Sequence, residues 1–285
     1  MIEKKKPGQE AVEKKGWVQS HKWLLLRRIS QFGILGFFLA GPLFGIWVIR
    51  GTLSASEVLG FLPMTDPLIM LQSLVAGHPL ASTALVGALV VAVMYALLGG
   101  GVFCSWVCPV NLVTDTAAWL NRVLGRKSGI KQGLHLNKNT RYWFMAAILV
   151  LSFVSGTIVY EWLNPVTMLQ RGLLFGMGMG WVFILAIFVF DVFLLRHGWC
   201  GHLCPMGATY SLLSLTAVLR VKAAGREQCT DCMDCFAVCP EPQVIRPALK
   251  GDAQTSPVIL DKNCLNCGRC IDICPHNVFR FSRRN

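Results

Sequence analysis

Eight of the twelve cysteines in this chain fall into one spacing that occurs twice near the C-terminus. The first run is Cys229, Cys232, Cys235 and Cys239, and the second is Cys264, Cys267, Cys270 and Cys274. A proline follows the last cysteine of each run. This C-x2-C-x2-C-x3-C-P spacing is that of bacterial ferredoxins with two 4Fe-4S clusters, in which the fourth cysteine of each run ligates the other cluster. Such an exchange ties both runs into one small fold, so it constrains the tail more than any other feature of the sequence.

The exchange rule predicts which cysteines hold each cluster. One 4Fe-4S cluster takes Cys229, Cys232, Cys235 and Cys274, and the other takes Cys264, Cys267, Cys270 and Cys239. Structural zinc sites use cysteine pairs separated by a longer gap, without a third cysteine two residues further on or a trailing Cys-Pro. Disulfides are disfavoured because the distribution of charge, described below, places the tail in the reducing cytoplasm.

The remainder of the chain is apolar. Hydrophobic residues make up 54% of the sequence and charged residues 15%, whereas about 25% of a typical soluble domain is charged. A helix that crosses a membrane needs about 20 mostly apolar residues. Four runs of about that length carry no charge except Asp191: Ile29 to Ile49, Ser82 to Phe103, Tyr142 to Tyr160 and Gly172 to Leu195. We therefore expect an α-helical integral membrane protein with four transmembrane helices, followed by a bacterial two-cluster ferredoxin-like α+β domain.

The basic residues are distributed unevenly over these four runs. Of the 27 Lys and Arg residues, 25 lie in the two terminal segments and the middle loop, and 2 lie in the other two loops. Short loops rich in Lys and Arg remain in the cytoplasm. We expect a multi-pass protein of the bacterial inner membrane with both termini and the cluster domain in the cytoplasm. The net charge of +12 is then a topology signal, and no nucleic-acid partner is expected because no recognition motif accompanies it.

Three regions follow from these patterns: a basic cytoplasmic segment over residues 1–28, a four-span domain over 29–220, and the di-4Fe-4S ferredoxin-like domain over 221–285. The outer loops, Arg50 to Ala81 and Glu161 to Arg171, contain several prolines. We expect turns and short helical pieces there.

Two further cysteine pairs, Cys104 with Cys108 and Cys200 with Cys204, each end in a Cys-Pro and follow the second and fourth runs. The repeat predicts two similar hairpins, as in membrane proteins with paired repeats. If each pair is α-helical, its two sulfurs share one face of a helix. Three interpretations remain open: an additional metal or cluster site, a thiol redox site, or simple burial of small side chains.

Haem and nucleotide cofactors are not expected. The chain has no C-x-x-C-H attachment motif, and none of its six histidines lies within the four apolar runs to serve as an axial ligand. The glycines at 172, 176, 178 and 180 indicate close helix packing and not a nucleotide loop.

Several short segments carry a resemblance to a known family. They are Lys14-Lys15-Gly16-Trp17, Thr65-Asp66-Pro67-Leu68, Phe103 to Pro109, Glu161 to Pro165 and His197 to Pro205. With the doubled cysteine run, they make the whole chain similar to the NapH-type ferredoxin subunits, membrane quinol dehydrogenases of periplasmic nitrate reductase systems. The resemblance implies that quinol is oxidised to quinone and that electrons pass to a periplasmic iron-sulfur subunit and then to nitrate reductase.

Oxidation of a quinol releases two protons, so its site needs an ionisable or hydrogen-bonding group. Glu161 is the first candidate because Tyr160 and Trp162 flank it. Asp66 and His78 are the other candidates on the outer side. Asp191 is the candidate on the inner side, since it is the only charge within a run.

Two alternative functions belong to other classes. The chain could sense redox state or assist cofactor assembly through its clusters, or it could anchor partner subunits to the membrane. The site chemistry favours electron transfer, while the acceptor rests on the family resemblance.

Overall fold

The computed structural model describes residues 7–79, 81–124, 137–176, 178–252 and 254–284. The chain divides into two compact units. The first, called here the cluster unit, combines Met1–Ser30, Tyr95–Trp106 and Ser211–Asn285. The second, the helical unit, combines Gln31–Met94 and Val107–Tyr210. The predicted ferredoxin-like tail therefore shares its unit with the N-terminal segment and with a short internal segment that carries Cys104.

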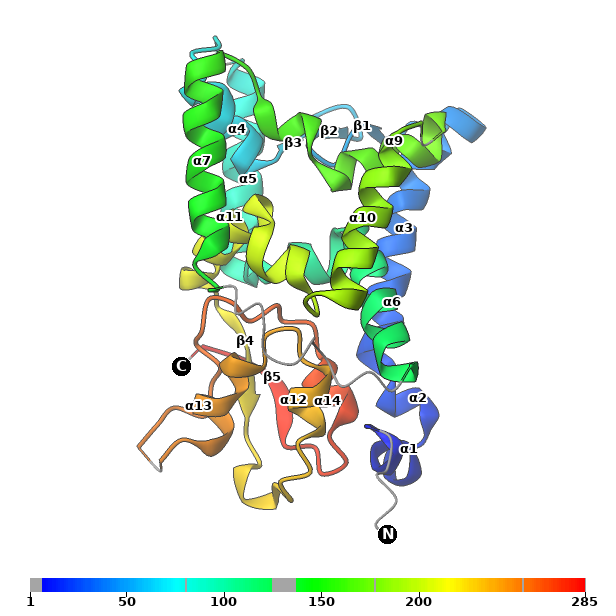
Figure 1. Cartoon of the computed structure of the whole chain (residues 1–285), viewed down its shortest axis with the longest axis vertical. Coiled ribbons are helices and arrows are strands. Elements are labelled where there is room, and N and C mark those ends of the chain that lie inside the picture. The colour runs from blue at the N-terminus through cyan, green and yellow to red at the C-terminus, as the bar shows by residue number, and fades with distance from the viewer. Residues whose placement is uncertain (1–6, 80, 125–136, 177, 253, 285) are drawn as a thin grey trace. The chain divides into compact units, whose positions relative to one another are not determined.

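Short helices and one two-stranded sheet make up the tail. Its elements are β4 (Leu219–Ala223), η4 (Arg226–Gln228), α12 (Asp234–Val238), η5 (Pro242–Val244), α13 (Ile245–Lys250), α14 (Arg269–Ile273) and β5 (Phe279–Arg283). Strands β4 and β5 are antiparallel, with Val221 opposite Phe281, and Figure 1 shows α12 and α14 beside them. The backbone N–H of Ile259 donates to the carbonyl of Val221 at 2.8 Å, which holds the segment between the two cysteine runs against the sheet.

The core of the tail is built around the cysteines themselves. Val221, Ile245, Ile259, Val278 and Phe279 are each at most 3% exposed and pack in one cluster with Cys235, Cys264 and Cys270. A domain this small has little apolar area to bury, so structural metal commonly supplies part of its stability. The cysteines occupy the centre where that metal would contribute most.

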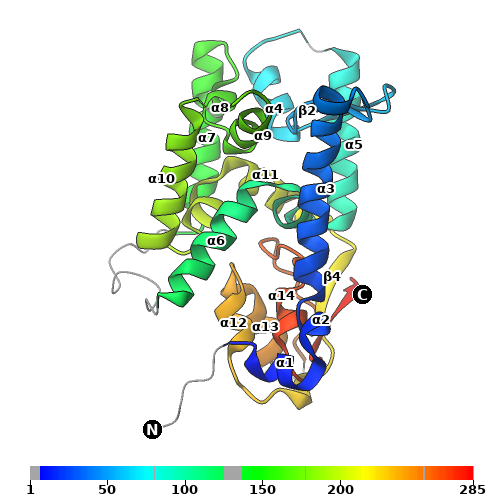
Figure 2. The same cartoon turned by 90° about the vertical axis from the view of Figure 1, so that its right-hand side faces the viewer.

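The N-terminal part of the cluster unit is helical. It contains α1 (Gln9–Lys15), α2 (Trp17–Ser20) and the first residues of α3 (Lys22–Phe44), and Figure 2 shows these three helices in succession. Gly16 has a φ of 80°, which separates α1 from α2. Residues 95–106 add the end of α5 (Ser82–Leu98) and most of a π-helix, η1 (Phe103–Val107).

The helical unit contains a small sheet and several helices of moderate length. Its remaining elements are β1 (Ile49–Gly51), β2 (Ala55–Val58), β3 (Leu62–Thr65), α4 (Pro67–Val75), α6 (Val110–Val123), α7 (Thr140–Ser155), α8 (Val159–Trp162), α9 (Pro165–Phe175), α10 (Gly180–Phe193), η2 (Trp199–Leu203) and α11 (Pro205–Leu213), and η3 (Ser214–Thr216) follows in the cluster unit. Helix α10 packs against α6 and α9, and α4 packs against α7. Strands β1 to β3 form an antiparallel meander. The prolines of this loop predicted turns and short helical pieces, and the sheet was not predicted.

The prediction of four transmembrane helices is wrong. Among the described residues, only α3, with 23 residues, is long and apolar enough to cross a membrane. The other three runs form α5, α7 and α10, with 17, 16 and 14 residues. At about 1.5 Å per residue these helices span roughly 21–26 Å, less than a hydrocarbon core of about 30 Å.

Glycine explains why the apolar runs exceed their helices. Gly99, with a φ of 97°, follows the end of α5, and Gly156, with a φ of 63°, ends α7. Gly176 and Gly178 also have positive φ, at 85° and 46°, and α10 begins only after them. Such backbone conformations suit glycine and interrupt an α-helix. The placement of both termini on one side rested on four crossings, so a single candidate helix does not support it.

Candidate functional site

The first cysteine run lines a pocket in the cluster unit. Four cysteines contribute to its wall: Cys229, Cys232, Cys235 and Cys274. Asp231 and Met233 have φ values of 57° and 63°, which bend the loop sharply between the cysteines before α12 begins. The Cys229 thiol lies 3.3 Å from Oδ1 of Asp231. A left-handed residue on either side of Cys232 thus turns this loop around the pocket.

The second run lines a separate pocket with the same design. Cys264, Cys267 and Cys270 contribute to its wall, together with Cys239 from the first run. Asn266 and Gly268 have φ values of 47° and 72°, at positions equivalent to those of Asp231 and Met233. The Cys264 thiol lies 3.6 Å from Oδ1 of Asn266, which repeats the contact in the first loop.

Each pocket therefore gathers four thiols, three from one run and the fourth from the other run. This is the donor set that a 4Fe-4S cluster requires, and the grouping is the one that the exchange rule predicts. Among the described residues, no three His, Cys, Asp or Glu side chains are placed to bind a single metal ion. Thiols spread over a pocket wall instead suit a cofactor with several irons. Ligation by these eight cysteines remains a prediction.

Burial makes two thiols of the second pocket hard to ionise without metal. It raises the pKa of Cys264 to about 12, and burial together with the neighbouring Cys267 and Cys239 raises the pKa of Cys270 well above the usual value. The thiolate is the form that binds iron. Assembly of a cluster in either pocket must therefore release protons, and metal binding is coupled to folding of the tail.

The N-terminal segment is attached to α14, the helix that carries Cys270 and ends before Cys274. The carboxylate of Asp272 accepts hydrogen bonds from the backbone N–H groups of Trp23 and Leu24, at 3.1 and 2.9 Å. These donors belong to the first turn of α3, whose N–H groups have no partner within the helix. Lys15 Nζ also donates to the carbonyl of Ile271 at 3.3 Å.

A second attachment joins residues 95–106 to the loop of the second run. Ser105 Oγ donates to the carbonyl of Leu265 at 2.8 Å, and Trp106 Nε1 donates to the carbonyl of Asn266 at 3.1 Å. Gly101 allows the close approach, since a Cβ there would lie 2.6 Å from both the carbonyl oxygen of Cys264 and the Cα of Leu265. In the sequence, Ser105 and Trp106 belong to a repeated motif, which did not predict these contacts.

The two Cys-x3-Cys pairs are not simple α-helical pairs. Cys104 and Cys200 lie in the π-helices η1 and η2. Cys204 follows η2 in an extended conformation, with φ of −66° and ψ of 115°. Cys104 belongs to the cluster unit, and the other three cysteines of these pairs belong to the helical unit.

Within the helical unit, Cys204 lies in a buried group of titratable side chains. Its sulfur accepts a hydrogen bond from the backbone N–H of Gly207 at 3.4 Å and lies 3.9 Å from the hydroxyl of Tyr160, which is fully buried. Burial raises the pKa of Cys108 to about 12, and the nearby thiol of Cys204 is the second cause of this increase.

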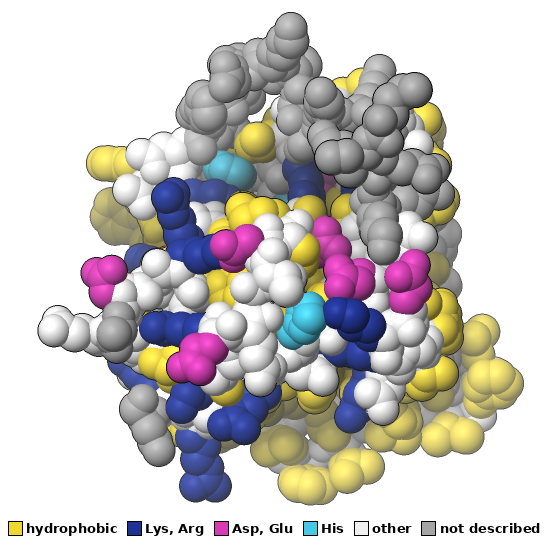
Figure 3. Space-filling view, turned by 90° about the horizontal axis from the view of Figure 1, so that it is seen from below, with side chains coloured by type: hydrophobic (Ala, Val, Ile, Leu, Met, Phe, Trp, Pro, Cys, Tyr) yellow, Lys and Arg dark blue, Asp and Glu magenta, His cyan; other side chains and the backbone are white. Residues whose placement is uncertain are grey.

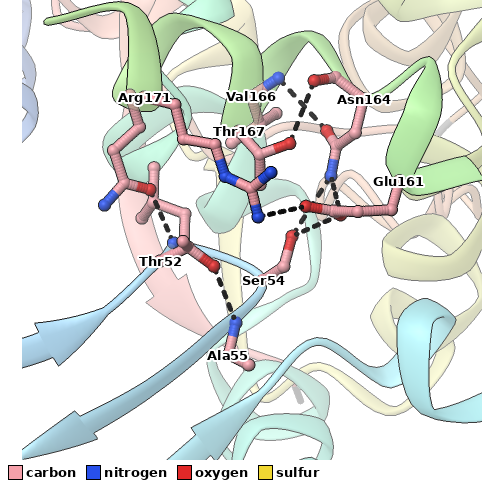
Figure 4. A network of polar contacts seen from close by, with 10 residues as sticks. Thr52, Ser54, Ala55, Glu161, Asn164, Val166, Thr167 and Arg171 are labelled. Carbon is pink, nitrogen blue, oxygen red and sulfur yellow. Dashed lines mark hydrogen bonds and ion pairs between the residues drawn. The ribbon is translucent and has the colours of Figure 1, made fainter. Parts of the chain in front are cut away.

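Of the predicted quinol-site residues, Glu161 and Asp66 lie in one electrostatic environment. The Glu161 carboxylate accepts hydrogen bonds from Ser54 Oγ and Asn164 Nδ2, both at 3.3 Å, and pairs with Arg171 at 3.4 Å, as Figure 4 shows. Its charge raises the pKa of Asp66, although burial of Asp66 is the larger cause.

Asp66 is buried, with 3% exposure, whereas Glu161 is half-buried. It accepts hydrogen bonds from Tyr210 Oη at 2.9 Å and from the backbone N–H groups of Leu68 and Ile69, which caps α4. Burial nevertheless raises its pKa to about 6.

The remaining two candidates lie elsewhere. Asp191 is buried on α10 and accepts a hydrogen bond from the backbone N–H of Trp199 at 3.1 Å. His78 is exposed, and its backbone N–H donates to Ser73.

Two protein families and several known proteins are similar to this chain in sequence. The family described as a 4Fe-4S dicluster domain matches residues 228–278, which contain both cysteine runs. The family described as a 4Fe-4S binding domain matches residues 80–131 and 177–225. The chain is 47% identical over 282 residues to the ferredoxin-type protein NapH of Escherichia coli, covering 99% of this chain and 96% of that relative.

It is also 50% identical over 275 residues to the methylamine utilization ferredoxin-type protein MauN of Methylorubrum extorquens, covering 96% and 94% of the two chains. The chain belongs to the NapH/MauN family of ferredoxin-type proteins. No solved structure matches it.

Membership of the NapH/MauN family, with the two 4Fe-4S domain matches, gives the chain an iron-sulfur electron-transfer role. With α3 as a candidate membrane helix, family membership also supports association with a membrane. The 4Fe-4S binding match includes Cys104, Cys108, Cys200 and Cys204. The family's iron-sulfur chemistry therefore extends in sequence beyond the tail.

Proposed function

We propose that this protein oxidises a membrane quinol and passes the electrons, through the clusters of its tail, toward a periplasmic iron-sulfur partner of a nitrate reductase system. The clusters would supply one-electron carriers, held by Cys229, Cys232, Cys235 and Cys274 in one pocket and by Cys264, Cys267, Cys270 and Cys239 in the other. The protein itself holds these pockets next to an apolar helix and provides proton acceptors for the quinol.

The observation that carries the proposal is the bond between Asp272 and α3. The Asp272 carboxylate lies between the cysteines of the second run and accepts the N–H groups of Trp23 and Leu24, at the start of the one described helix that is long enough to cross a membrane. A one-electron carrier fixed to such a helix is placed to meet a lipid-soluble donor. Quinol is the donor class that fits this position.

A general base works best when its pKa is near the ambient pH, and burial raises the pKa of Asp66 to about 6 and that of Asp191 to about 7. Asp66 is the preferred proton acceptor because a second carboxylate, Glu161, also influences its pKa. Tyr210 Oη donates to its carboxylate and orients it. Glu161, held by Arg171 and Asn164, is the neighbouring second acceptor, because two protons leave each quinol.

The similarity to known proteins also supports a second possible destination for the electrons. Relatives named methylamine utilization ferredoxin-type protein are as similar to this chain as those named NapH, at 49–50% against 47% identity. A methylamine-utilization system is therefore the alternative destination of the electrons, with the same donor and clusters.

The test is reduction of the clusters by quinol in anaerobically purified protein held in lipid nanodiscs. We expect a reduced ubiquinol or menaquinol analogue to bleach the visible absorption of the clusters. The variant Asp66→Asn should slow this step, and Asp252→Asn, at an exposed position of the tail, serves as its control. Clusters that dithionite reduces but no quinol reduces would favour a redox-sensing, assembly or anchoring role instead.

A further inference from the structure

The two cysteine pockets differ in their exposure. Residues 230–233 of the first loop are all exposed, including Cys232 and Met233, which is 52% exposed. At the equivalent positions of the second loop, Leu265 is half-buried, and Asn266, Cys267 and Gly268 are buried. The two cysteine runs have the same spacing, but the loop of the first run is open to solvent and the loop of the second run is covered by protein.

The cover over the second loop is the chain's own polypeptide. Ser105, which is fully buried, and Trp106 donate to the carbonyls of Leu265 and Asn266. The amide Nδ2 of Asn266 donates in turn to the carbonyl of Leu98 at 3.2 Å and to that of Leu219 at 2.8 Å. Three hydrogen bonds thus fix residues 98–106 to two adjacent residues of one ligand loop, and the fourth joins that loop to β4.

Aromatic side chains complete the cover. Trp23 packs so closely on Gly268 that a Cβ there would lie 2.6 Å from its ring. The ring centroid of Trp23 is 6.1 Å from that of Trp106 and 4.6 Å from that of Phe281. Asn266, Cys267 and Gly268 are buried in the second loop, so an external redox protein has a less direct approach to it than to the first loop.

We infer that the two clusters would have different roles in electron transfer: the second, at Cys239, Cys264, Cys267 and Cys270, would receive electrons inside the protein, beneath the covering segment 98–106, and the first would pass them to an external soluble carrier. This inference rests on the proposed electron-transfer function and deepens it. Cys104 lies in the covering segment, adjacent in sequence to Ser105.

Electrons enter and leave the tail one at a time in this scheme. Each quinol would supply two electrons, one after the other, and its two protons would go to the acceptors proposed above. Each electron would pass from the second cluster to the first and then to a one-electron acceptor, and no bond forms or breaks in the tail. Figure 3 shows both basic and acidic side chains on the face seen from below. The exposure of the first loop is what distinguishes the two clusters.

The test uses the full-length, dithionite-reduced holoprotein and a soluble dysprosium chelate, which broadens the EPR signal of any cluster it can approach. We expect the chelate to broaden one of the two cluster signals several-fold more than the other. Cys267→Ser, which retains the first cluster, should show the broadened signal. Cys232→Ser, which retains the second, should show the protected one.

Equal broadening of both signals, or stronger broadening in Cys232→Ser, would overturn the inference. If a cysteine variant loses all its iron, Trp106→Phe assigns the signals instead, because it keeps every cysteine and removes only one hydrogen-bond donor. Trp106→Phe should shift the EPR signal that the chelate does not broaden. A shift of the signal that the chelate broadens would count against the inference. Trp119→Phe, at a 58% exposed tryptophan of the helical unit, should shift neither. Quinol takes no part in this experiment, so its outcome is independent of whether quinol is the donor.

Discussion

Asp272 accepts a hydrogen bond from the backbone N–H of Leu24 at 2.9 Å, across 248 residues of sequence. Its second oxygen accepts the N–H of Trp23. The carboxylate therefore acts as an N-cap for α3 that comes from a distant part of the chain. A negative charge at this position also interacts favourably with the positive end of the helix dipole.

We expect Asp272→Ala to destabilise the cluster unit by about 0.5–2 kcal/mol, the usual effect of losing an N-cap side chain. The measurement is the temperature at which the holoprotein loses its visible cluster absorption. Asp252→Ala, at an exposed carboxylate, is the matched control and should leave that temperature unchanged. If both variants behave alike, the bond to α3 contributes nothing to stability.

Anaerobically purified protein should contain about eight irons from the tail alone, because two complete four-cysteine sites are present. Replacing Cys229 with serine should remove about half of this iron and loosen the tail, since metal binding and folding are coupled. Iron analysis and susceptibility to proteolysis report the two effects. Four irons or fewer in intact, air-protected protein contradicts the assignment of two clusters.

The rate of cluster reduction by quinol should fall as the pH drops below about 6. Burial raises the pKa of Asp66 to about 6 from an ordinary value of 3.8, so its carboxylate is protonated below this pH and cannot accept a proton. Asp66→Asn should be slow at every pH and should lose this inflection. A wild-type profile that is flat between pH 5 and 7 excludes Asp66 as the acceptor.

The same shift affects stability, with a defined sign. A carboxyl group whose pKa is higher in the folded protein than in the unfolded chain stabilises the fold at low pH, and this contribution is lost as the pH rises through about 6. We expect Asp66→Asn, which keeps an oxygen acceptor for Tyr210, to be less sensitive to pH over this range. Thermal unfolding of the two proteins between pH 4 and 7 measures the difference.

Cys108 and Cys204 should act as one site. Cys204 influences Cys108 electrostatically, and Tyr160 lies 3.9 Å from the Cys204 sulfur. Residues that share a site commonly show coupling energies of about 0.5–3 kcal/mol in a double-mutant cycle. Loss of quinol-dependent reduction in Cys108→Ala should therefore be nearly as large as in the double variant. Small effects that add would show that the two cysteines are ordinary buried side chains.

The sequence identified the chemistry of the tail better than the architecture of the rest. Spacing alone grouped Cys239 with the second run, and the structure places it in that pocket. The spacing rule specifies this grouping although Cys239 and Cys264 lie 25 positions apart, and ligation of a cluster by these cysteines remains a prediction. Ser105 and Leu265 are 160 positions apart in sequence, and Asp272 and Trp23 are 249 positions apart. No local sequence pattern predicts contacts over such separations.

The four-span prediction failed for a physical reason. An uncharged run measures apolarity, whereas helix length depends on backbone conformation, and Gly99 and Gly156 end α5 and α7 with positive φ angles. The sheet of β1 to β3 was missed because prolines such as Pro63 suggested turns, although proline is tolerated in an edge strand. In both cases the local backbone conformation, at glycine or at proline, determined a structure that the sequence pattern did not predict.

The exchange of fourth cysteines is the claim on which both cluster sites and the electron path depend, and Cys239→Ser tests it most directly. Cys239 belongs to the first run in sequence and lines the second pocket in the structure. EPR of the reduced variant, compared with Cys232→Ser and Cys267→Ser, shows which cluster has been altered. The exchange predicts that Cys239→Ser alters the signal that Cys267→Ser removes and retains the signal that Cys232→Ser removes. If Cys239→Ser instead reproduces the spectrum of Cys232→Ser, each run holds its own cluster and the exchange is contradicted.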